Sequence, residues 1–99
     1  MKKIILFLMA LAIVSSCSYR NFTDGIRSFK VQNYRQAFIL LKPEAEKGQP
    51  DAQYAVGYMY YYGYGVVEDR IKACYWIKRA AALGQPDAVQ AVEILRLNT

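Results

Sequence analysis

Apolar residues recur every three or four positions in two segments of the chain, 34–47 and 70–83. This spacing is typical of amphipathic helices that bury one face, and both segments are rich in residue types that favour helices. The apolar faces consist of Ala37, Leu40, Leu41 and Ala45 in the first segment, and of Ala73, Ile77, Ala80 and Ala81 in the second. With further helices expected at 23–32, 51–62 and 86–97, the pattern predicts an all-α chain of about five helices.

The pentapeptide GQPDA occurs twice, at 48–52 and 84–88, directly after each of these two segments. Gly48 and Gly84 stand where a helix ends in a left-handed residue, a conformation that glycine adopts at least cost. The proline suits the first turn of the next helix because it lacks the N–H that this turn leaves unpaired. The aspartate places a negative charge at the positive end of that helix. The repeated peptide is therefore predicted to be a joint between helices and not a ligand site.

The segments that lead into the two joints superpose at an offset of 36 residues, with Ala37 on Ala73 and Ala45 on Ala81. A fixed period in the thirties is typical of helical repeat proteins. The stretch YYYGYGVVED followed by KACYWIKRAA resembles the Sel-one-like repeat, a relative of the tetratricopeptide repeat. The residues at the repeat positions are Gly48, Ala52, Gly57, Gly63, Gly65, Ala73, Trp76, Ala80, Gly84 and Ala88. The resemblance implies a short α-solenoid of antiparallel helix pairs.

The N-terminus has the three parts of a secretory signal peptide, namely a basic start, an apolar run and small residues at a junction. Lys2 and Lys3 precede an apolar run of 11 residues, 4–14, which is followed by SSC. This run is shorter than the roughly 20 residues that cross a bilayer as a helix. The sequence VSSC resembles a bacterial lipobox, which implies cleavage before Cys17 and attachment of lipid to its thiol.

The lipobox divides the chain into three parts. We expect a lipoprotein signal peptide at 1–16, a lipidated N-terminus with a short linker at 17–21, and the repeat domain at 22–99. In the lipoproteins that this segment resembles, an Asp directly after the modified cysteine favours retention at the inner membrane. Here that position is occupied by Ser18. The expected location is therefore the outer membrane, on its periplasmic or surface face, with the lipid as the contact to the membrane.

Composition limits the chemistry of the mature chain. Removal of Lys2 and Lys3 from the 13 basic residues leaves 11 against 8 acidic ones, a net charge of +3 that does not indicate nucleic acid as a partner. With Cys17 acylated, Cys74 has no partner for an intrachain disulfide. The chain has no histidine and no glycine-rich phosphate loop. We therefore expect no catalytic residue, no metal and no cofactor.

Tyrosine is unusually frequent, with 9 residues in the chain. Steps of three and four residues place four of them on one face of the helix expected at 51–62, which the tetratricopeptide register makes the concave face: Tyr54, Tyr58, Tyr61 and Tyr62. The apolar side chains expected near this groove from the first unit are Phe22, Ile26 and Phe29. Tyrosine is enriched in interfaces, so this face is either a binding surface or only packing between helices.

Two functions from different classes fit these features. The first is a membrane-anchored interaction module or scaffold of the cell envelope, whose partner is an unknown envelope or secreted protein. The alternative is a cell-wall accessory factor that binds peptidoglycan or modulates a wall-active enzyme. Since repeat arrays of this kind usually contain about three units, self-association through exposed repeat ends is a further expectation.

Overall fold

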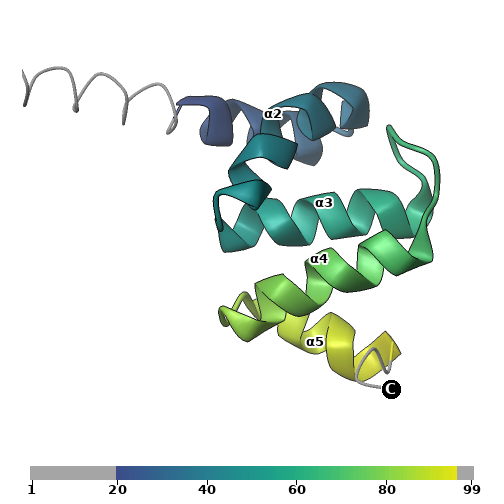
Figure 1. Cartoon of the computed structure of the whole chain (residues 1–99). Coiled ribbons are helices and arrows are strands. Elements are labelled where there is room, and N and C mark those ends of the chain that lie inside the picture. The colour runs from purple at the N-terminus through teal and green to yellow at the C-terminus, as the bar shows by residue number, and fades with distance from the viewer. Residues whose placement is uncertain (1–19, 96–99) are drawn as a thin grey trace, which may run out of the picture.

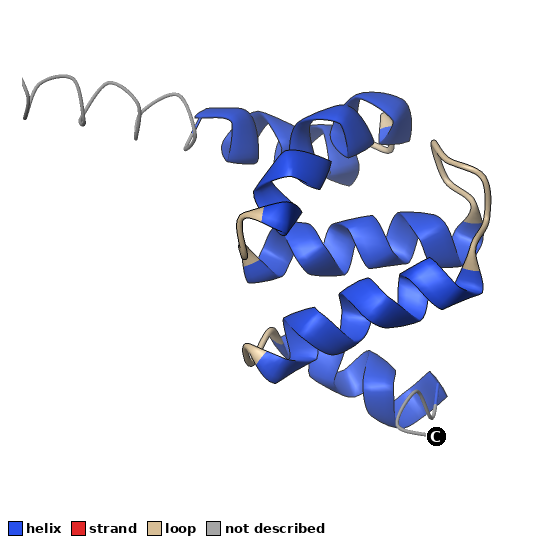
Figure 2. Ribbon diagram, in the orientation of Figure 1, coloured by secondary structure: helices blue, strands red, loops and turns tan. Residues whose placement is uncertain are grey.

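The computed structural model describes residues 20–95, and helices with short connections make up this whole part of the chain without any strand (Figure 2). A helix covers 20–30, and it is followed by α2 (Tyr34–Glu46), α3 (Pro50–Tyr62), α4 (Arg70–Ala82) and α5 (Pro86–Leu95). Consecutive helices run in alternating directions (Figure 1). α3 packs between α2 and α4, and α5 packs on α4 (Figure 1). The predicted all-α solenoid of antiparallel helix pairs is confirmed.

The first described helix differs from the prediction at both ends. Residues 20 and 21 are helical although they were expected in the linker at 17–21, because nothing in this segment stops a helix from including them. The helix ends at residue 30 and not at 32. The expected end of α5 at residue 97 lies outside the described residues. Within residues 20–95, no helix is long and apolar enough to cross a membrane.

Both GQPDA peptides form the predicted joint. Gly48 and Gly84 have φ values of 104° and 84°, in the left-handed region. The Gly48 N–H donates to the carbonyl of Ala45 at 3.0 Å, and the Gln49 N–H donates to Glu44 at 3.1 Å. In the second joint, the Gly84 N–H donates to the carbonyl of Ala81 and the Gln85 N–H donates to the carbonyl of Ala80. This pair of bonds is the Schellman motif, which satisfies the last carbonyls of a helix.

The glutamine of each joint has a role that the sequence did not reveal. The side-chain Oε1 of Gln49 accepts the Asp51 N–H at 2.7 Å, and that of Gln85 accepts the Ala88 N–H at 2.7 Å. Each glutamine therefore caps the helix that follows it, as Ser, Thr, Asp or Asn more often does. Gln85 Nε2 also donates to Asp51 Oδ1 at 3.1 Å. The second joint is thus hydrogen-bonded to the first.

The core lies between α2, α3 and α4, and small residues allow these helices to approach closely. Its buried side chains include Ala37, Leu41, Ala45, Ala52, Val56, Met59, Ala73 and Trp76. A smaller cluster of Ile77, Ala80, Ala88 and Val92 joins α4 to α5. A Cβ atom added to Gly57 would lie 2.6 Å from Ile77 Cγ1, and one added to Gly25 would lie 2.6 Å from Leu41 Cδ2. The two glycines therefore lie at helix contacts that leave no room for a side chain.

Replacement of Gln32 by glycine is expected to raise the free energy of unfolding by about 1 kcal/mol. Gln32 follows the first described helix with a φ of 65°. Its N–H donates to the carbonyl of Phe29, three residues earlier, and the joint glycines make the same kind of bond. Glycine adopts this left-handed conformation without the steric cost that glutamine bears there. Denaturant unfolding measures the change. As a control, Gln36→Gly on the exposed side of α2 should lower the free energy of unfolding by about 1 kcal/mol, and a loss of stability in both variants would contradict the argument.

Candidate binding groove

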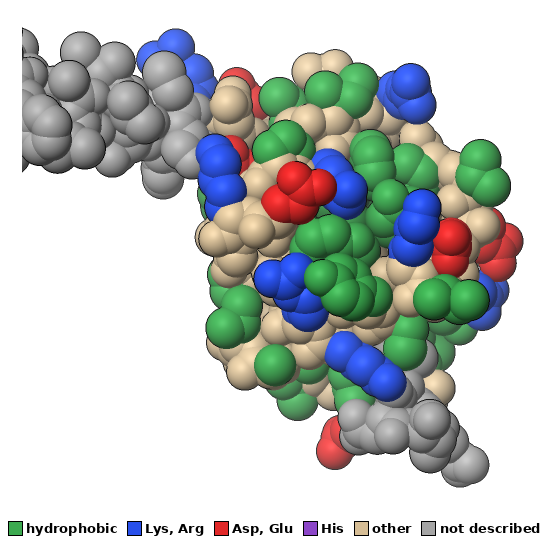
Figure 3. All heavy atoms as spheres, in the orientation of Figure 1, with side chains coloured by type: hydrophobic (Ala, Val, Ile, Leu, Met, Phe, Trp, Pro, Cys, Tyr) green, Lys and Arg blue, Asp and Glu red, His purple; other side chains and the backbone are tan. Residues whose placement is uncertain are grey.

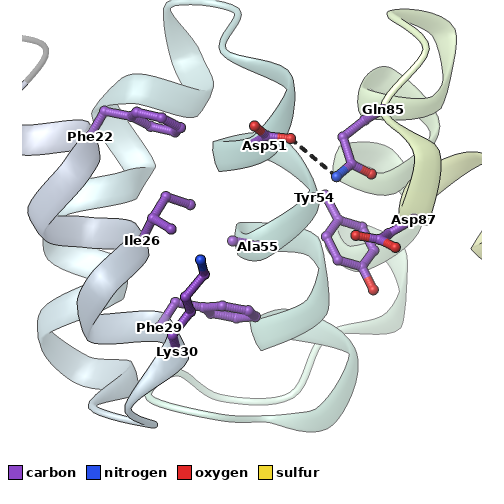
Figure 4. A pocket seen from close by; sticks show the side chains of 9 residues that line it. All are labelled: Phe22, Ile26, Phe29, Lys30, Asp51, Tyr54, Ala55, Gln85 and Asp87. Atoms are coloured by element: carbon purple, nitrogen blue, oxygen red, sulfur yellow. Dashed lines mark hydrogen bonds between the residues drawn. The ribbon is translucent and has the colours of Figure 1, made fainter.

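An open groove of about 320 Å³ lies where three helices meet. It is formed by the helix at 20–30, by α3 and by the start of α5 (Figure 4). Its lining consists of Phe22, Ile26, Phe29, Lys30, Asp51, Tyr54, Ala55, Gln85 and Asp87. The volume is at the lower end of the range for sites that hold small ligands. This is enough space for one or two side chains of a bound peptide.

The groove has an apolar wall and charges of opposite sign on its two sides. Phe22, Ile26 and Phe29 project from one helix toward α3 (Figure 4). Lys30 belongs to the same helix, whereas Asp51 and Asp87 lie across the groove at the starts of α3 and α5 (Figure 4). The bond from Gln85 to Asp51 fixes the position of one of these carboxylates. The site can therefore contact an apolar side chain and a basic group at the same time.

Four tyrosines form a cluster of packed rings beside the groove, and we call Tyr34, Tyr58, Tyr62 and Tyr64 the tyrosine cluster. The Tyr34 and Tyr64 rings are stacked with centroids 4.8 Å apart, and Tyr62 and Tyr64 are stacked at 5.4 Å. Tyr58 contacts Tyr62 at 4.8 Å. Phe29 of the groove meets Tyr58 edge to face at 5.4 Å, so the groove and the tyrosine cluster form one continuous aromatic surface.

The loop between α3 and α4 brings Tyr64 into this cluster. Gly63 and Gly65 both have positive φ values, 72° and 75°. A Cβ atom on Gly65 would lie 2.6 Å from the backbone carbonyl carbon of Tyr34, so only glycine lets the loop approach the start of α2 this closely. The loop ends at Asp69, whose side chain accepts the Lys72 N–H at 3.0 Å and caps α4.

The four tyrosines expected on the concave face have three different environments. Tyr54 lines the groove, and Tyr58 and Tyr62 belong to the tyrosine cluster. Tyr61 packs against the core, and the guanidinium carbon of Arg70 lies 3.8 Å from the centre of its ring. The three apolar residues expected near the groove all line it. The residues of the groove and the tyrosine cluster that the sequence did not place there are Lys30, Tyr34, Asp51, Ala55, Tyr64, Gln85 and Asp87.

Burial raises the pKa of Tyr54 above its ordinary value of 10.0, and the charge of Asp87 adds to the shift. Burial also raises the pKa of Tyr58, with further contributions from Tyr34, Tyr62 and Tyr64. Neutral phenols are favoured in such surroundings because an ionised oxygen would lose hydration and face other negative charges. Both hydroxyls therefore stay protonated at neutral pH and can donate hydrogen bonds to a bound group.

Above about pH 10, the free energy of unfolding is expected to fall more steeply in the parent protein than in a Tyr54→Phe/Tyr58→Phe double variant. Both phenols hold their protons more tightly in the folded than in the unfolded chain. The unfolded chain therefore ionises first, and stability is lost as the pH rises through the raised pKa values. Denaturant unfolding at several alkaline pH values tests this, and equal slopes in the two proteins would contradict it.

The other expected sites are placed as follows. Within residues 20–95, no three His, Cys, Asp or Glu side chains come close enough together to hold a metal ion. Cys74 is a free, half-buried cysteine on α4. Of the repeat positions, Ala73, Trp76 and Ala80 are buried on α4, where they contribute to packing. Cys17, the expected lipidation site, lies outside the described residues.

Comparison with protein families gives two matches. A family model described as "Sel1 repeat" matches residues 23–48 and 50–85. A second, described as "Prokaryotic membrane lipoprotein lipid attachment site", matches residues 1–18. The two matched regions together extend from the N-terminus to the last joint.

Two curated relatives match part of the chain. The "ERAD-associated E3 ubiquitin-protein ligase component HRD3A" of Arabidopsis thaliana is 35% identical over 54 residues, 54% of this chain and 8% of the relative. The "Chitin synthase regulatory factor 3" of Schizosaccharomyces pombe is 36% identical over 72 residues, 73% of this chain and 8% of the relative. The chain thus spans a small part of each of these proteins. No solved structure matches.

Proposed function

We propose that this chain is a lipid-anchored interaction module of the bacterial cell envelope. The proposal starts from two facts: the chain belongs to the Sel1 repeat family, and it carries a prokaryotic lipoprotein attachment site. Sel1 repeats are in general non-catalytic modules for protein–protein interaction, and we assign no reaction to this chain. The observation that carries the proposal is the open groove that continues into the tyrosine cluster. It offers a partner apolar, aromatic and charged groups on one surface.

The partner segment that fits the groove is a peptide with an apolar side chain next to a basic one. The apolar side chain would contact Phe22, Ile26 and Phe29, and the basic group would lie near Asp51 and Asp87. The tyrosine cluster extends the contact area, since Tyr62 and Tyr64 are 50% and 40% exposed. Tyrosine contributes a large contact area at a small cost in side-chain entropy.

The lipid at Cys17 would hold this groove at a membrane surface, with the outer membrane favoured by Ser18. A domain confined to a surface meets a partner on the same membrane at a raised local concentration. A groove of this small volume can therefore be enough to bind the partner, because the raised local concentration compensates for a modest affinity of the peptide contact.

Site-specific photocrosslinking in the native host tests this function. A photoreactive residue at Tyr62 is expected to yield a discrete adduct with an envelope protein. Tyr75 on α4 lies outside both the groove lining and the tyrosine cluster and is 53% exposed against 50% for Tyr62, so a photoreactive residue there is a matched control. Asp87→Lys should abolish the Tyr62 adduct by reversing a charge of the groove. An adduct that forms equally at both positions, or that survives Asp87→Lys, would refute the proposal.

One observation favours binding of wall glycan as a second function. The rings of Tyr62 and Tyr64 are stacked at an interplanar angle of 18° and partly exposed, and exposed aromatic rings can also stack on sugars. In this case the purified protein should sediment with isolated cell walls, and Tyr62→Ala/Tyr64→Ala should remain in solution. Sedimentation that is equal with and without these rings would exclude the tyrosine cluster as a glycan site.

A further inference from the structure

The outward faces of α2 and α4 combine basic and apolar side chains, and we call this surface the basic face. It consists of Arg35, Ile39 and Lys42 on α2, and of Ile71, Lys72, Tyr75, Lys78 and Arg79 on α4. Lysine and arginine side chains surround hydrophobic ones over these two helices (Figure 3). Ile71 is 84% exposed and Ile39 is 54% exposed, so large aliphatic side chains reach solvent among the cations.

The basic face carries little compensating negative charge. α4 has no acidic residue. Of the two glutamates of α2, Glu46 is 3.0 Å from Lys42, and Glu44 is buried and 3.4 Å from Lys47. The surface is therefore net positive, while both carboxylates of α2 already have cationic partners.

Aromatic rings hold two of the cations in place across the two helices. Lys42 Nζ lies 5.7 Å from the centre of the Trp76 ring, so it reaches from α2 to α4. The guanidinium carbon of Arg79 lies 5.3 Å from the same ring, and Arg79 donates to the Tyr75 hydroxyl at 2.8 Å. The Trp76 ring thus lies beside one cation of each helix, and Arg79 has no carboxylate partner among the described ion pairs whereas Lys42 is paired with Glu46.

We infer that the basic face docks on the anionic surface of the bilayer to which the chain is anchored. Cys17 is three residues before the helix at 20–30, and three residues span at most about 10 Å. The lipid therefore holds the domain against the bilayer, where each Lys or Arg gains from the negative surface potential. Ile39, Ile71 and Tyr75 would enter the headgroup region, as apolar side chains of surface-bound helices do.

This orientation leaves the groove accessible. The groove is built from the helix at 20–30, α3 and α5, whereas the basic face is built from α2 and α4, which alternate with them along the chain. The inference rests on the lipid attachment of the proposed function but not on what the groove binds.

Trp76 makes the docking measurable in the intact lipoprotein because it is the only tryptophan of the chain and underlies the basic face. The lipidated protein is placed in vesicles that contain a dansyl-labelled headgroup lipid. We expect energy transfer from Trp76 with phosphatidylglycerol-containing vesicles and much less with purely phosphatidylcholine vesicles. Raising the salt from about 0.1 M to about 1 M, which shortens the Debye length from about 10 Å to about 3 Å, should remove the difference.

Charge variants then locate the contact. The ratio of docked to undocked domains should fall about fivefold for each cation removed from the basic face, which Lys72→Gln/Lys78→Gln tests with two exposed residues. Arg27→Gln/Lys30→Gln removes the same charge from the helix at 20–30 and should leave the transfer unchanged. Equal loss in both double variants, or equal transfer with both vesicle types, would overturn the inference. Tyr62→Ala, which affects only the groove side, should also leave the transfer unchanged.

Discussion

Replacement of Gly57 by valine is expected to lower the free energy of unfolding by about 3 kcal/mol, a large part of the stability of so small a domain. The Cβ position lies 2.6 Å from Ile77 Cγ1, 3.1 Å from the Ile77 nitrogen and 3.2 Å from the Ala73 oxygen. Two of these neighbours are backbone atoms of α4, and Ile77 is buried, so α3 and α4 would have to separate. Thermal unfolding should show a fall in Tm of more than roughly 10 °C.

Two control variants distinguish the steric effect of this contact on stability from the effect of the new residue's helix propensity. Gly57→Ala would stabilise an exposed helix by about 1 kcal/mol, but here we expect it to destabilise because the added methyl group meets α4. Ala82→Val, on the exposed side of α4, tests the cost of a β-branched residue alone and should lower stability by less than about 1 kcal/mol. A more stable Gly57→Ala protein would show that the two helices are not in close contact at this position.

The helices and their joints could be predicted because the signals are local. Glycine at a left-handed position and proline in a first turn act within a few residues, so Gly48 and Gly84 were sufficient to place the helix ends. The glutamine caps were missed because glutamine is rarely found in this role and its side chain must fold back onto its own helix. The end of the first helix was misplaced because Gln32, and not glycine, has the left-handed conformation there.

The groove could be predicted only in part because its composition depends on contacts between distant segments. The helical period placed Tyr54, Tyr58, Tyr61 and Tyr62 on one face of α3, but it could not show that Arg70 covers Tyr61. Tyr64 joins the tyrosine cluster because the loop after α3 returns to the start of α2 and places it on Tyr34. Periodicity within one helix contains no information on this contact. Lys30 and Asp87 likewise come from distant segments, and the fold places their charges on opposite sides of the groove.

The second large effect concerns the anchor. Replacement of Cys17 by serine is expected to reduce incorporation of a fatty-acid analogue to background, a loss of more than about a hundredfold, because the thiol that takes the lipid is removed. The anchor itself should be lasting in the parent protein. A single myristoyl-like chain binds a bilayer only reversibly, whereas the lipoprotein resemblance implies three chains. Metabolic labelling followed by gel analysis measures the incorporation, and the retained signal peptide should also slow the migration of the variant.

The second cysteine provides the control for this experiment, since Cys17 and Cys74 are the two cysteines of the chain. Cys74 lies half-buried on α4 between Ala73 and Tyr75, far along the chain from the lipid attachment site matched at 1–18. Cys74→Ser should therefore retain full labelling and membrane association, with at most a small loss of stability from the more polar hydroxyl. Label that persists in Cys17→Ser and disappears in Cys74→Ser would move the lipid into the repeat domain. The anchor would then no longer hold the first helix at the bilayer, and the docking of the basic face would lose its basis.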